Sequence, residues 1–492
     1  MGLLPSIATA SPAPQSMEYA KTWLVNDANK PGEQQTGMVC TGSRFRCHAH
    51  VHATPDGHIK PYATPQGFGA KDIESAYHIP LTPVSGTPTV AIIDAYGYAS
   101  LESDLATYRS TMGLPACTTA SGCLKIVNQT GGATLPPDPP TSDDWTVETA
   151  LDVDMISAGC PGCNIVVIQA TDDQGDGLFI ANNLPSTIHA TTISNSWGGP
   201  EQAATGANAA TAYETYFNHP GAAIFVSAGD DGYDDGGGQN GGPDYPATSQ
   251  YVISVGGTNL VKDNSTRGWS ETAWSVAGGN GAGGSACSLS IPKPTYQASL
   301  KTGCPFKATT DISAVADPQT GVAVYNHGTW QVVGGTSASS PLMASIWAVT
   351  GNGANTTGDF VASMKSTYHD VTSGNNGTCP SGESLICNAA AGWDGPTGWG
   401  TPDATALVVT GGTGSGGTGS GSAGGGDGTG DGGGDGGGTG GGGGGGGGGV
   451  VNTGDGGNDV VGGCAAAGGG GSGAVILLLG AALVTRRRRA AA

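Results

Sequence analysis

The sequence is poor in charged residues, and positive charge is the scarcest. Asp, Glu, Lys and Arg make up 12% of the 492 residues, against about 25% in typical globular domains. Lys and Arg together number 18 and Asp and Glu number 39, so the formal net charge is −21. Because such a chain repels phosphate groups, a nucleic-acid partner bound by general electrostatics is excluded. The 90 glycines indicate instead that part of the chain has low sequence complexity.

A histidine suited to act as a catalytic base is also lacking. His48, His50 and His52 alternate in a polar amino-terminal segment, where we expect an exposed strand face outside the α/β core, with weak metal binding as the alternative. His327 precedes Gly-Thr but lies close before Ser337 and begins no long helix. The other histidines have no recognisable catalytic neighbours. A mechanism that depends on an imidazole base is therefore disfavoured.

Cysteine, in contrast, is plentiful and clustered. Ten of the eleven cysteines fall into close pairs, which predict five local disulfides: Cys40–Cys47, Cys117–Cys123, Cys160–Cys163, Cys287–Cys304 and Cys379–Cys387. Such bonds persist in an oxidising compartment. A redox dithiol is the alternative for Cys160-Pro-Gly-Cys163, but this motif follows a helical pattern, whereas a thioredoxin motif opens a helix. Cys464 is left over.

The carboxyl-terminal part of the chain has the composition of a tether and a membrane anchor. Residues 411–449 are almost entirely Gly, Thr, Ser and Asp, a composition typical of flexible coil. The stretch Ala465–Thr485 carries no charged residue and is followed by Arg486–Arg489. We expect it to span a bilayer with the arginines on the cytoplasmic side, and a disordered Gly-Ala-rich end is the alternative. Residues 1–14 lack a positive region and are at best a truncated signal peptide.

Between these ends, apolar β-rich runs alternate with helical patterns. We expect buried strands at Thr89–Asp94, Ile165–Ile168, Thr192–Trp197, Ala223–Ser227 and Tyr251–Val255. We expect helices at Leu101–Met112, Trp145–Ser157 and Ala207–Phe217. This order predicts an α/β fold with a doubly wound, mostly parallel sheet. Its chemistry is expected beyond the carboxyl ends of the strands, in the loops after Asp94, Trp197 and Ser227.

Ser337 lies in a small-residue turn before a helical pattern, in Gly334-Gly-Thr-Ser337-Ala-Ser-Ser-Pro341. A hydroxyl at a helix N-terminus has glycines beside it for close substrate approach, and the field there stabilises developing negative charge. Taken alone, Ser337 is as well explained as a helix cap.

Three carboxylates supply the acid-base chemistry that the histidines do not. Glu148 and Asp152 are four residues apart in a helical pattern and project from one face. Two partly buried carboxylates in contact do not ionise together easily, so one keeps its proton while the other serves as base. Asp230 follows a strand, where a protonated carboxyl donates to an oxyanion or, alternatively, caps a turn.

Together these residues resemble the sedolisin family, the serine-carboxyl peptidases with a subtilisin-like fold. The matching motifs are Glu148-x-x-x-Asp152, Ser227-Ala-Gly-Asp230 and Gly335-Thr-Ser337-Ala-Ser. The resemblance implies that Ser337 is the nucleophile, Glu148 its base, Asp152 the group that orients the base, and Asp230 the oxyanion donor. It also implies endopeptidase activity through an acyl-enzyme, favoured at acidic pH.

The resemblance further implies one bound Ca²⁺. The ligands would be the side chains of Asp370 and Asp394 and the carbonyl oxygens of Val371, Ala390 and Gly392. Separately, the order of Cys464, apolar stretch and arginine run resembles the MYXO-CTERM sorting tails of bacterial surface proteins. In those tails the cysteine is implicated in processing and anchoring.

We therefore divide the chain into an amino-terminal segment (1–71), a peptidase domain (72–410), a glycine-rich linker (411–463) and a sorting or transmembrane tail (464–492). We expect a monomer anchored outside a bacterial envelope that acts on protein or peptide substrates. Two departures from the family are a short region before the catalytic pattern, where members carry a large prodomain, and Asp231 at a position where the family often has serine. The alternatives are a neutral subtilisin-like protease with Asp94 as the orienting acid and a catalytically silent adhesin.

Overall fold

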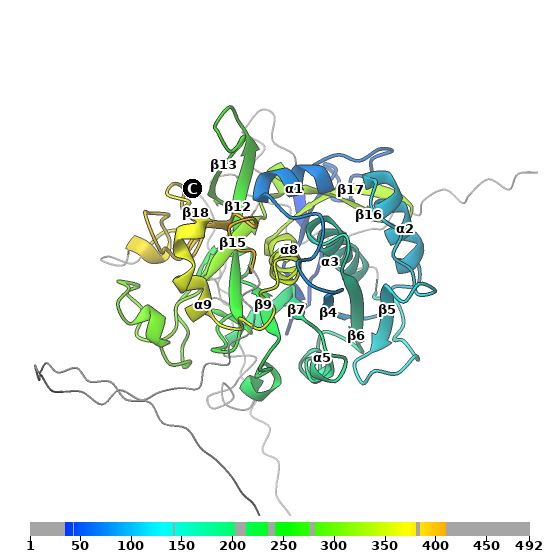
Figure 1. Ribbon diagram of the computed structural model, residues 1–492, viewed down its shortest axis with the longest axis horizontal. Helices are drawn as coiled ribbons and strands as arrows, with labels where there is room; N and C mark the ends of the chain where they lie inside the picture. Colours follow the sequence, from blue (N-terminus) through cyan, green and yellow to red (C-terminus); the bar gives the residue numbers. More distant parts are fainter. Residues whose placement is uncertain are drawn as a thin grey trace, which may run out of the picture. The chain divides into compact units, whose positions relative to one another are not determined.

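A mostly parallel β-sheet forms the centre of the fold (Figure 1). The computed structural model describes residues 35–42, 44–140, 143–201, 213–234, 242–275, 281–379 and 384–409. The strands of this sheet are β4 (Thr89–Ala95), β5 (Leu124–Asn128), β6 (Asn164–Ala170), β7 (Thr192–Asn195), β9 (Ala223–Ser227), β12 (Ile253–Lys262), β13 (Trp269–Ala273) and β15 (Ile312–Val315). Their order is β13-β12-β9-β7-β4-β6-β5, with β15 also paired to β12. Only the β12–β13 pair in this sheet is antiparallel, so the predicted α/β class is confirmed.

Near-continuous apolar sequence explains why the central strands form. All residues of β4 and β6 are buried except the first of each, as expected of parallel strands covered on both faces. The strand predicted at Thr192–Trp197 is divided: β7 ends at Asn195, and Trp197 begins β8 (Trp197–Pro200). The reason is that β8 leaves the parallel sheet to pair antiparallel with two other strands.

Two buried helices cross this sheet and pack against each other, α3 (Trp145–Gly159) and α8 (Thr336–Val349). Every residue of both is buried, and the Asp144 side chain caps α3 by accepting from the Thr146 N–H. The remaining α-helices described are α1 (Ala70–Tyr77), α2 (Leu101–Met112), α4 (Gly177–Ala181), α5 (Leu184–Thr187) and α9 (Gly358–Ser363). Of the helix predicted at Ala207–Phe217, only residues 213–217 are described, and they hold helical Tyr213 followed by the 3-10 turn Glu214–Tyr216.

The amino-terminal segment is built into the fold. Its strands β1 (Thr36–Met38) and β3 (His50–His52) join β17 (Thr329–Gly334) and β16 (Val322–Asn326) in the order β1-β3-β17-β16. The exposed strand face predicted for His48, His50 and His52 is wrong, because these residues are 1%, 6% and 6% exposed. The pattern misled because the three rings contact residues far away in the sequence, which local sequence does not reveal: Ser227 for His48, Trp274 for His50 and the Pro318 carbonyl for His52.

Short strand pairs complete the described structure. Strand β2 (Arg46–Cys47) pairs with β8, which also pairs with β11 (Asp244–Tyr245). Strand β10 (Asp231–Tyr233) pairs with β14 (Ala282–Ser285), and β18 (Tyr368–His369) pairs with β19 (Thr401–Pro402). Strands β8 and β10 directly follow the central strands β7 and β9, so their small sheets lie at the carboxyl ends of those two strands.

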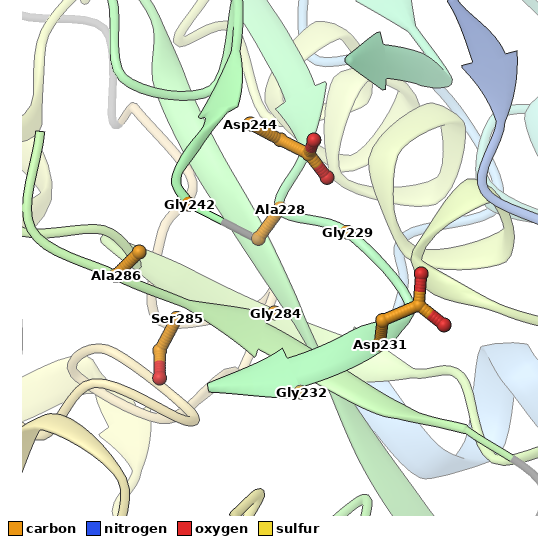
Figure 2. Close-up of a pocket in the computed structure, with 9 residues that line it drawn as sticks. All are labelled: Ala228, Gly229, Asp231, Gly232, Gly242, Asp244, Gly284, Ser285 and Ala286. Carbon is orange, nitrogen blue, oxygen red and sulfur yellow. The ribbon is translucent and has the colours of Figure 1, made fainter. Parts of the chain in front are cut away.

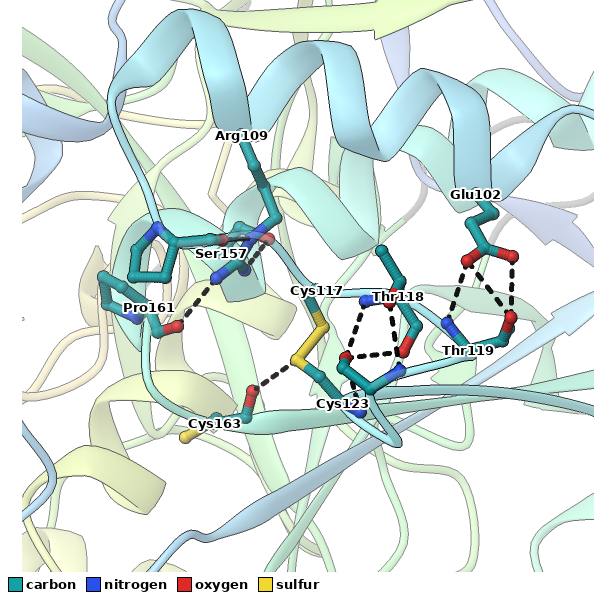
Figure 3. Close-up of a disulfide and its surroundings, with 11 residues drawn as sticks. Glu102, Arg109, Cys117, Thr118, Thr119, Cys123, Ser157, Pro161 and Cys163 are labelled. Atoms are coloured by element: carbon teal, nitrogen blue, oxygen red, sulfur yellow. Dashed lines mark hydrogen bonds between the residues drawn. A yellow bond between two sulfur atoms is a disulfide. The ribbon is translucent and has the colours of Figure 1, made fainter.

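All five predicted disulfides are confirmed. Figure 3 shows the Cys117–Cys123 bond, whose short turn is held by hydrogen bonds between Thr118 and Ser121. No helix in the described part of the chain is long and apolar enough to cross a membrane. The predicted linker, Cys464 and the Ala465–Thr485 span lie outside the described residues.

Candidate active site

Ser337 is the second residue of α8, at the end of the turn that leads from β17. The cap residue Gly335 has a φ of 102°, a left-handed conformation that favours glycine. A Cβ atom there would lie 2.5 Å from Oδ2 of Asp230, so the close approach of the Asp230 carboxyl also requires glycine. The Ser337 side chain is buried, and its Oγ donates to the Ser196 carbonyl at 3.0 Å.

Helix α3 brings two carboxyl groups to this serine. Glu148 and Asp152 are both 0% exposed, and α3 packs on α8. Asp152 Oδ1 accepts from the Ser196 hydroxyl at 2.8 Å, so Ser196 contacts both Asp152 and Ser337. Both Glu148 oxygens are buried without a hydrogen-bond partner among the described residues. Burying a carboxyl without a hydrogen-bond partner costs folding free energy. The Glu148 carboxyl is thus available to receive the proton of Ser337.

A third acid, Asp94, joins this pair from the carboxyl end of β4. Burial raises the pKa of Asp94 to about 7. Burial, and then the charges of Asp152 and Asp94, raise the pKa of Glu148 well above its usual range, while the Ser337 hydroxyl acts in the opposite direction. Burial and Asp94 likewise raise the pKa of Asp152. Three buried acids next to one another do not ionise together, so at least one keeps its proton at a pH where free carboxyls have lost theirs, while another accepts a proton.

Asp230 lies on the other side of Ser337, in the turn after β9. Its Oδ1 accepts from the backbone N–H of Thr336 at 2.7 Å and from the Thr336 hydroxyl at 2.8 Å. Its Oδ2 has no hydrogen-bond partner among the described residues, although His50 Nε2 lies 3.7 Å away. Burial raises the pKa of Asp230 to about 7. In acid this carboxyl is therefore protonated and able to donate a hydrogen bond.

A small pocket lies beside Asp230, under the loop that joins β9 to β10 (Figure 2). Its lining is mostly glycine and small residues: Ala228, Gly229, Asp231, Gly232, Gly242, Asp244, Gly284, Ser285 and Ala286. The absence of side chains on four of these residues leaves the space, and Asp244 and Asp231 are its only charged lining residues. The pocket thus combines small size with negative charge.

Three contributors to the site were not predicted to act in it. Ser196, Thr336 and Asp244 hold or line it through a carbonyl, a hydroxyl and a carboxylate. Two of them lie in stretches that the sequence analysis identified, since Ser196 is in the strand predicted at Thr192–Trp197 and Thr336 precedes Ser337. Their proximity to the motifs was a signal, but their contacts depend on tertiary packing.

Two further groups of residues could hold a metal ion. Asp370 Oδ2 accepts from the Gly392 N–H and Asp394 Oδ2 from the Ala390 N–H, both at 2.9 Å, so the two acids hold the turn that carries two of the three predicted carbonyl ligands. Separately, ligand atoms of His78, His369 and Asp403 lie within 4.8 Å of one another. Oxygen donors suit Ca²⁺, whereas the two imidazoles suit a transition metal.

Comparison with known proteins shows the family and fold of this chain. The family model described as the Subtilase family matches residues 142–400. The chain is 31% identical to kumamolisin from Bacillus sp. (strain MN-32), an alignment that covers 70% of this chain and 64% of kumamolisin. It is 29% identical to sedolisin from Pseudomonas sp. (strain 101), covering 70% of this chain and 61% of sedolisin. The chain thus spans just under two thirds of the length of these relatives.

A solved structure of Pseudomonas sedolisin, described as a serine-carboxyl proteinase complexed with two molecules of pseudo-iodotyrostatin, is also similar. It has 30% sequence identity and a TM-score of 0.58, and the match covers 70% of this chain and 98% of that one. The family match covers the region that holds Glu148, Asp230 and Ser337. The chain therefore belongs to the subtilase family, and sedolisin and kumamolisin are its homologues.

Proposed function

We propose that this chain is a serine-carboxyl endopeptidase that hydrolyses peptide bonds in acid. The observation that carries the proposal is the position of Ser337 between two sets of groups: buried acids on α3 and β4, and Asp230 after β9. The first set provides a proton acceptor, and the second provides a hydrogen-bond donor. A nucleophile placed between them is what acyl transfer requires.

In the proposed reaction, the Ser337 Oγ attacks the substrate carbonyl carbon and its proton passes to Glu148. Asp152 orients Glu148, and protonated Asp230 donates to the oxyanion together with the Ser337 backbone N–H. Glu148 then gives its proton to the leaving amine, and a water molecule repeats the sequence to release the acid product. The bonds to the oxyanion are preorganised, because Thr336 fixes one oxygen of Asp230.

The neutral alternative needs an imidazole that accepts the proton of Ser337. His48 Nδ1 lies 2.7 Å from the Ser227 hydroxyl and its Nε2 3.3 Å from Asp244, while the nearest acid to His50 Nε2 is Asp230. Both rings are thus directed to other groups. Asp94, the orienting acid of that alternative, is instead a neighbour of the two carboxyls on α3.

The pH dependence of the rate tests this assignment. We expect kcat for a fluorogenic peptide to be highest in acid and to fall as the pH rises through about 7, because Asp230 then loses the proton that it donates. Asp230→Asn keeps an N–H donor at every pH, so its rate should be lower but should not show this fall. A wild-type rate that rises through a pKa near 6.5, the ordinary value of histidine, would instead support the neutral alternative.

We also propose that one Ca²⁺ is held by the side chains of Asp370 and Asp394 and by the carbonyls of Val371, Ala390 and Gly392. Support comes from burial of Asp394, which is 0% exposed, and from the two hydrogen bonds that fold the 390–394 turn around both acids. Hard cations prefer such oxygen ligands. When bound, the ion would neutralise two neighbouring negative charges.

Removal of calcium should therefore lower stability. For a site near saturation, a chelator is expected to reduce Tm by roughly 5 °C or more, and excess Ca²⁺ but not Mg²⁺ should restore it. Differential scanning calorimetry measures this without any assay of activity. Asp370→Asn should abolish the response, whereas Asp359→Asn on α9 serves as the control; an unchanged Tm in the chelated wild type would argue against the site.

Secretion and anchoring at the cell surface are proposed as well. The support is the set of five disulfides, which persist in oxidising compartments, together with the apolar stretch and arginine run of the carboxyl-terminal sequence. Detection of the protein only in a cytoplasmic fraction would contradict this proposal.

A further inference from the structure

Two histidines and an aspartate from three separate parts of the chain lie together. His78 ends α1, His369 is the last residue of β18, and Asp403 directly follows β19. Each residue offers one ligand atom, and these atoms all lie within 4.8 Å of one another. None of the three belongs to the groups around Ser337, so the proposed peptide hydrolysis does not account for the cluster.

Backbone hydrogen bonds already hold the three residues near one another. Strands β18 and β19 pair antiparallel, and His369 lies opposite Thr401, two residues before Asp403. The Ala404 N–H donates to the carbonyl of Tyr77, the last residue of α1, at 2.9 Å. The backbone next to each of the three side chains is therefore fixed, as a preorganised binding site requires.

His78 has a backbone conformation that is unusual for a residue with a side chain. Its φ is 50° and its ψ is 46°, the left-handed conformation in which helices commonly end on glycine and less often on asparagine. Residues other than glycine in this conformation are more frequent at functional sites. The carboxyl end of a helix also favours positive charge, and α1 has no basic residue in its last turn. A cation bound by His78 would supply that charge.

His369 provides a ring nitrogen that has no hydrogen-bond partner among the described residues. This atom, Nε2, is buried. The His369 ring lies edge-on to the ring of His78, with the two centroids 6.2 Å apart. A buried polar atom without a partner costs folding free energy. An ion bound at Nε2 would remove this cost.

The two carboxylate oxygens of Asp403 have different contacts. Oδ1 accepts from the N–H and the hydroxyl of Thr405, at 3.1 and 2.6 Å, and these bonds fix the orientation of the carboxylate. Oδ2 lies 3.1 Å from Nδ1 of His78. The His78 and Asp403 side chains are 40% and 25% exposed, so an ion can reach them from solvent.

The spacing and the types of ligand atom fit a divalent transition-metal ion. With zinc bonds of about 2.0–2.1 Å, tetrahedral geometry places ligand atoms roughly 3.4 Å apart. The 3.1 Å between His78 Nδ1 and Asp403 Oδ2 and the upper limit of 4.8 Å for the cluster bracket this value. Two imidazoles favour Zn²⁺ over Ca²⁺ and Mg²⁺, which prefer oxygen ligands. Arg267 acts electrostatically on His369, but its charge is balanced by Glu271 in an ion pair of 2.7 Å.

We propose that His78, His369 and Asp403 bind one Zn²⁺ ion, with water as the fourth ligand of a tetrahedral site. The ion takes the place of the proton between His78 Nδ1 and Asp403 Oδ2, and His78 stays neutral with its proton on Nε2. His78 and Asp403 are 325 residues apart in the sequence, so the ion would join α1 to the β18–β19 pair. The site is distinct from the proposed Ca²⁺ site, although Asp370 directly follows His369.

Metal binding is measured on the full chain at neutral pH, after chelation and with Ca²⁺ restored so that the proposed calcium ligands are occupied. Co²⁺ should produce the strong visible absorption of a tetrahedral site with nitrogen ligands, and Zn²⁺ should displace it. Zn²⁺ at about 100 times its Kd should raise Tm by roughly 3 °C or more, because it binds only the folded state. Neither measurement needs an assay of activity.

His78→Asn is the most informative variant, because asparagine also adopts the left-handed backbone conformation and its amide can still contact Asp403. It should weaken Zn²⁺ binding at least about 100-fold, since losing a direct ligand costs more than losing an outer partner. Its Tm without Zn²⁺ should stay close to that of the wild type. Asp403→Asn is a second variant, and it should weaken binding at least about tenfold.

His58→Ala is the matched control. His58 Nε2 lies 3.6 Å from Asp56 Oδ2, and its side chain is 33% exposed, so this is also a partly exposed histidine beside an aspartate, but it lies outside the cluster. The control should bind Co²⁺ and Zn²⁺ as the wild type does.

Loss of the absorption and of the Tm increase in His78→Asn and Asp403→Asn, with both retained in His58→Ala, would support the site. Wild-type affinity in both cluster variants would show that the ion binds elsewhere on the chain and would overturn the proposal. A weak absorption typical of octahedral Co²⁺, or no effect of Zn²⁺ on the Tm of the wild type, would overturn it as well. These outcomes do not depend on whether the chain is a peptidase.

Discussion

Replacing Ser337 with alanine is expected to reduce cleavage of denatured protein in acid by about 10⁴- to 10⁶-fold, the loss typical of removing a catalytic serine. The hydroxyl is the group that forms the acyl-enzyme, and the side chain lost is small. Ser337 Oγ makes one hydrogen bond, to the Ser196 carbonyl, so the substitution should change the fold little. The expected result is a folded protein with an unchanged Tm and almost no kcat.

The matched control is Ser345→Ala on the same helix. The Ser345 hydroxyl is also buried and donates to a carbonyl of its own helix, Leu342, but it lies far along α8 from the turn at Gly335. We expect this variant to keep kcat within a few-fold of the wild type. Retained cleavage by Ser337→Ala, or an equal loss in both variants, would contradict the assignment of the nucleophile.

The parts of this molecule that could be predicted from the sequence are those encoded over short distances. The spacing of Glu148 and Asp152 places both on one helix face, and the five disulfides join cysteines 3 to 17 residues apart. The parallel sheet follows from buried apolar runs such as β4. In each case the sequence pattern and the structure that it predicts lie within one or two helices or strands. Periodicity and composition are therefore sufficient to predict that structure.

The placement of residues 44–52 could not be predicted, because their contacts are with residues far away in the sequence. His48 contacts Ser196, Ser227 and Ser337, each of which lies in a distant part of the sequence. Nothing in the alternation of three histidines distinguishes side chains that face water from side chains covered by distant parts of the chain. Asp94 is a second case. The sequence shows that it lies at the end of a strand, but it comes close to Glu148 and Asp152 only when the sheet packs against α3.

Replacing Glu148 with glutamine should lower kcat by at least about 10³-fold, since an amide of nearly the same shape cannot accept the proton of Ser337. Because glutamine carries no charge, Asp94 and Asp152 should ionise more easily in this variant. Glu148 has no hydrogen-bond partner among the described residues, so glutamine breaks no existing bond. Stability should therefore change little, and a large loss of activity would report on proton transfer.

Asp154→Asn is the control for this substitution, because Asp154 is a third buried carboxyl on α3 and its bonded oxygen contacts β16. Its Oδ2 accepts from the backbone N–H of Tyr325, a bond that the asparagine carbonyl can keep. We expect its kcat to remain within a few-fold of the wild type. The decisive comparison is between the two variants at one acidic pH: if Glu148→Gln were as active as Asp154→Asn, a carboxyl base would be excluded and the proton of Ser337 would need a different acceptor.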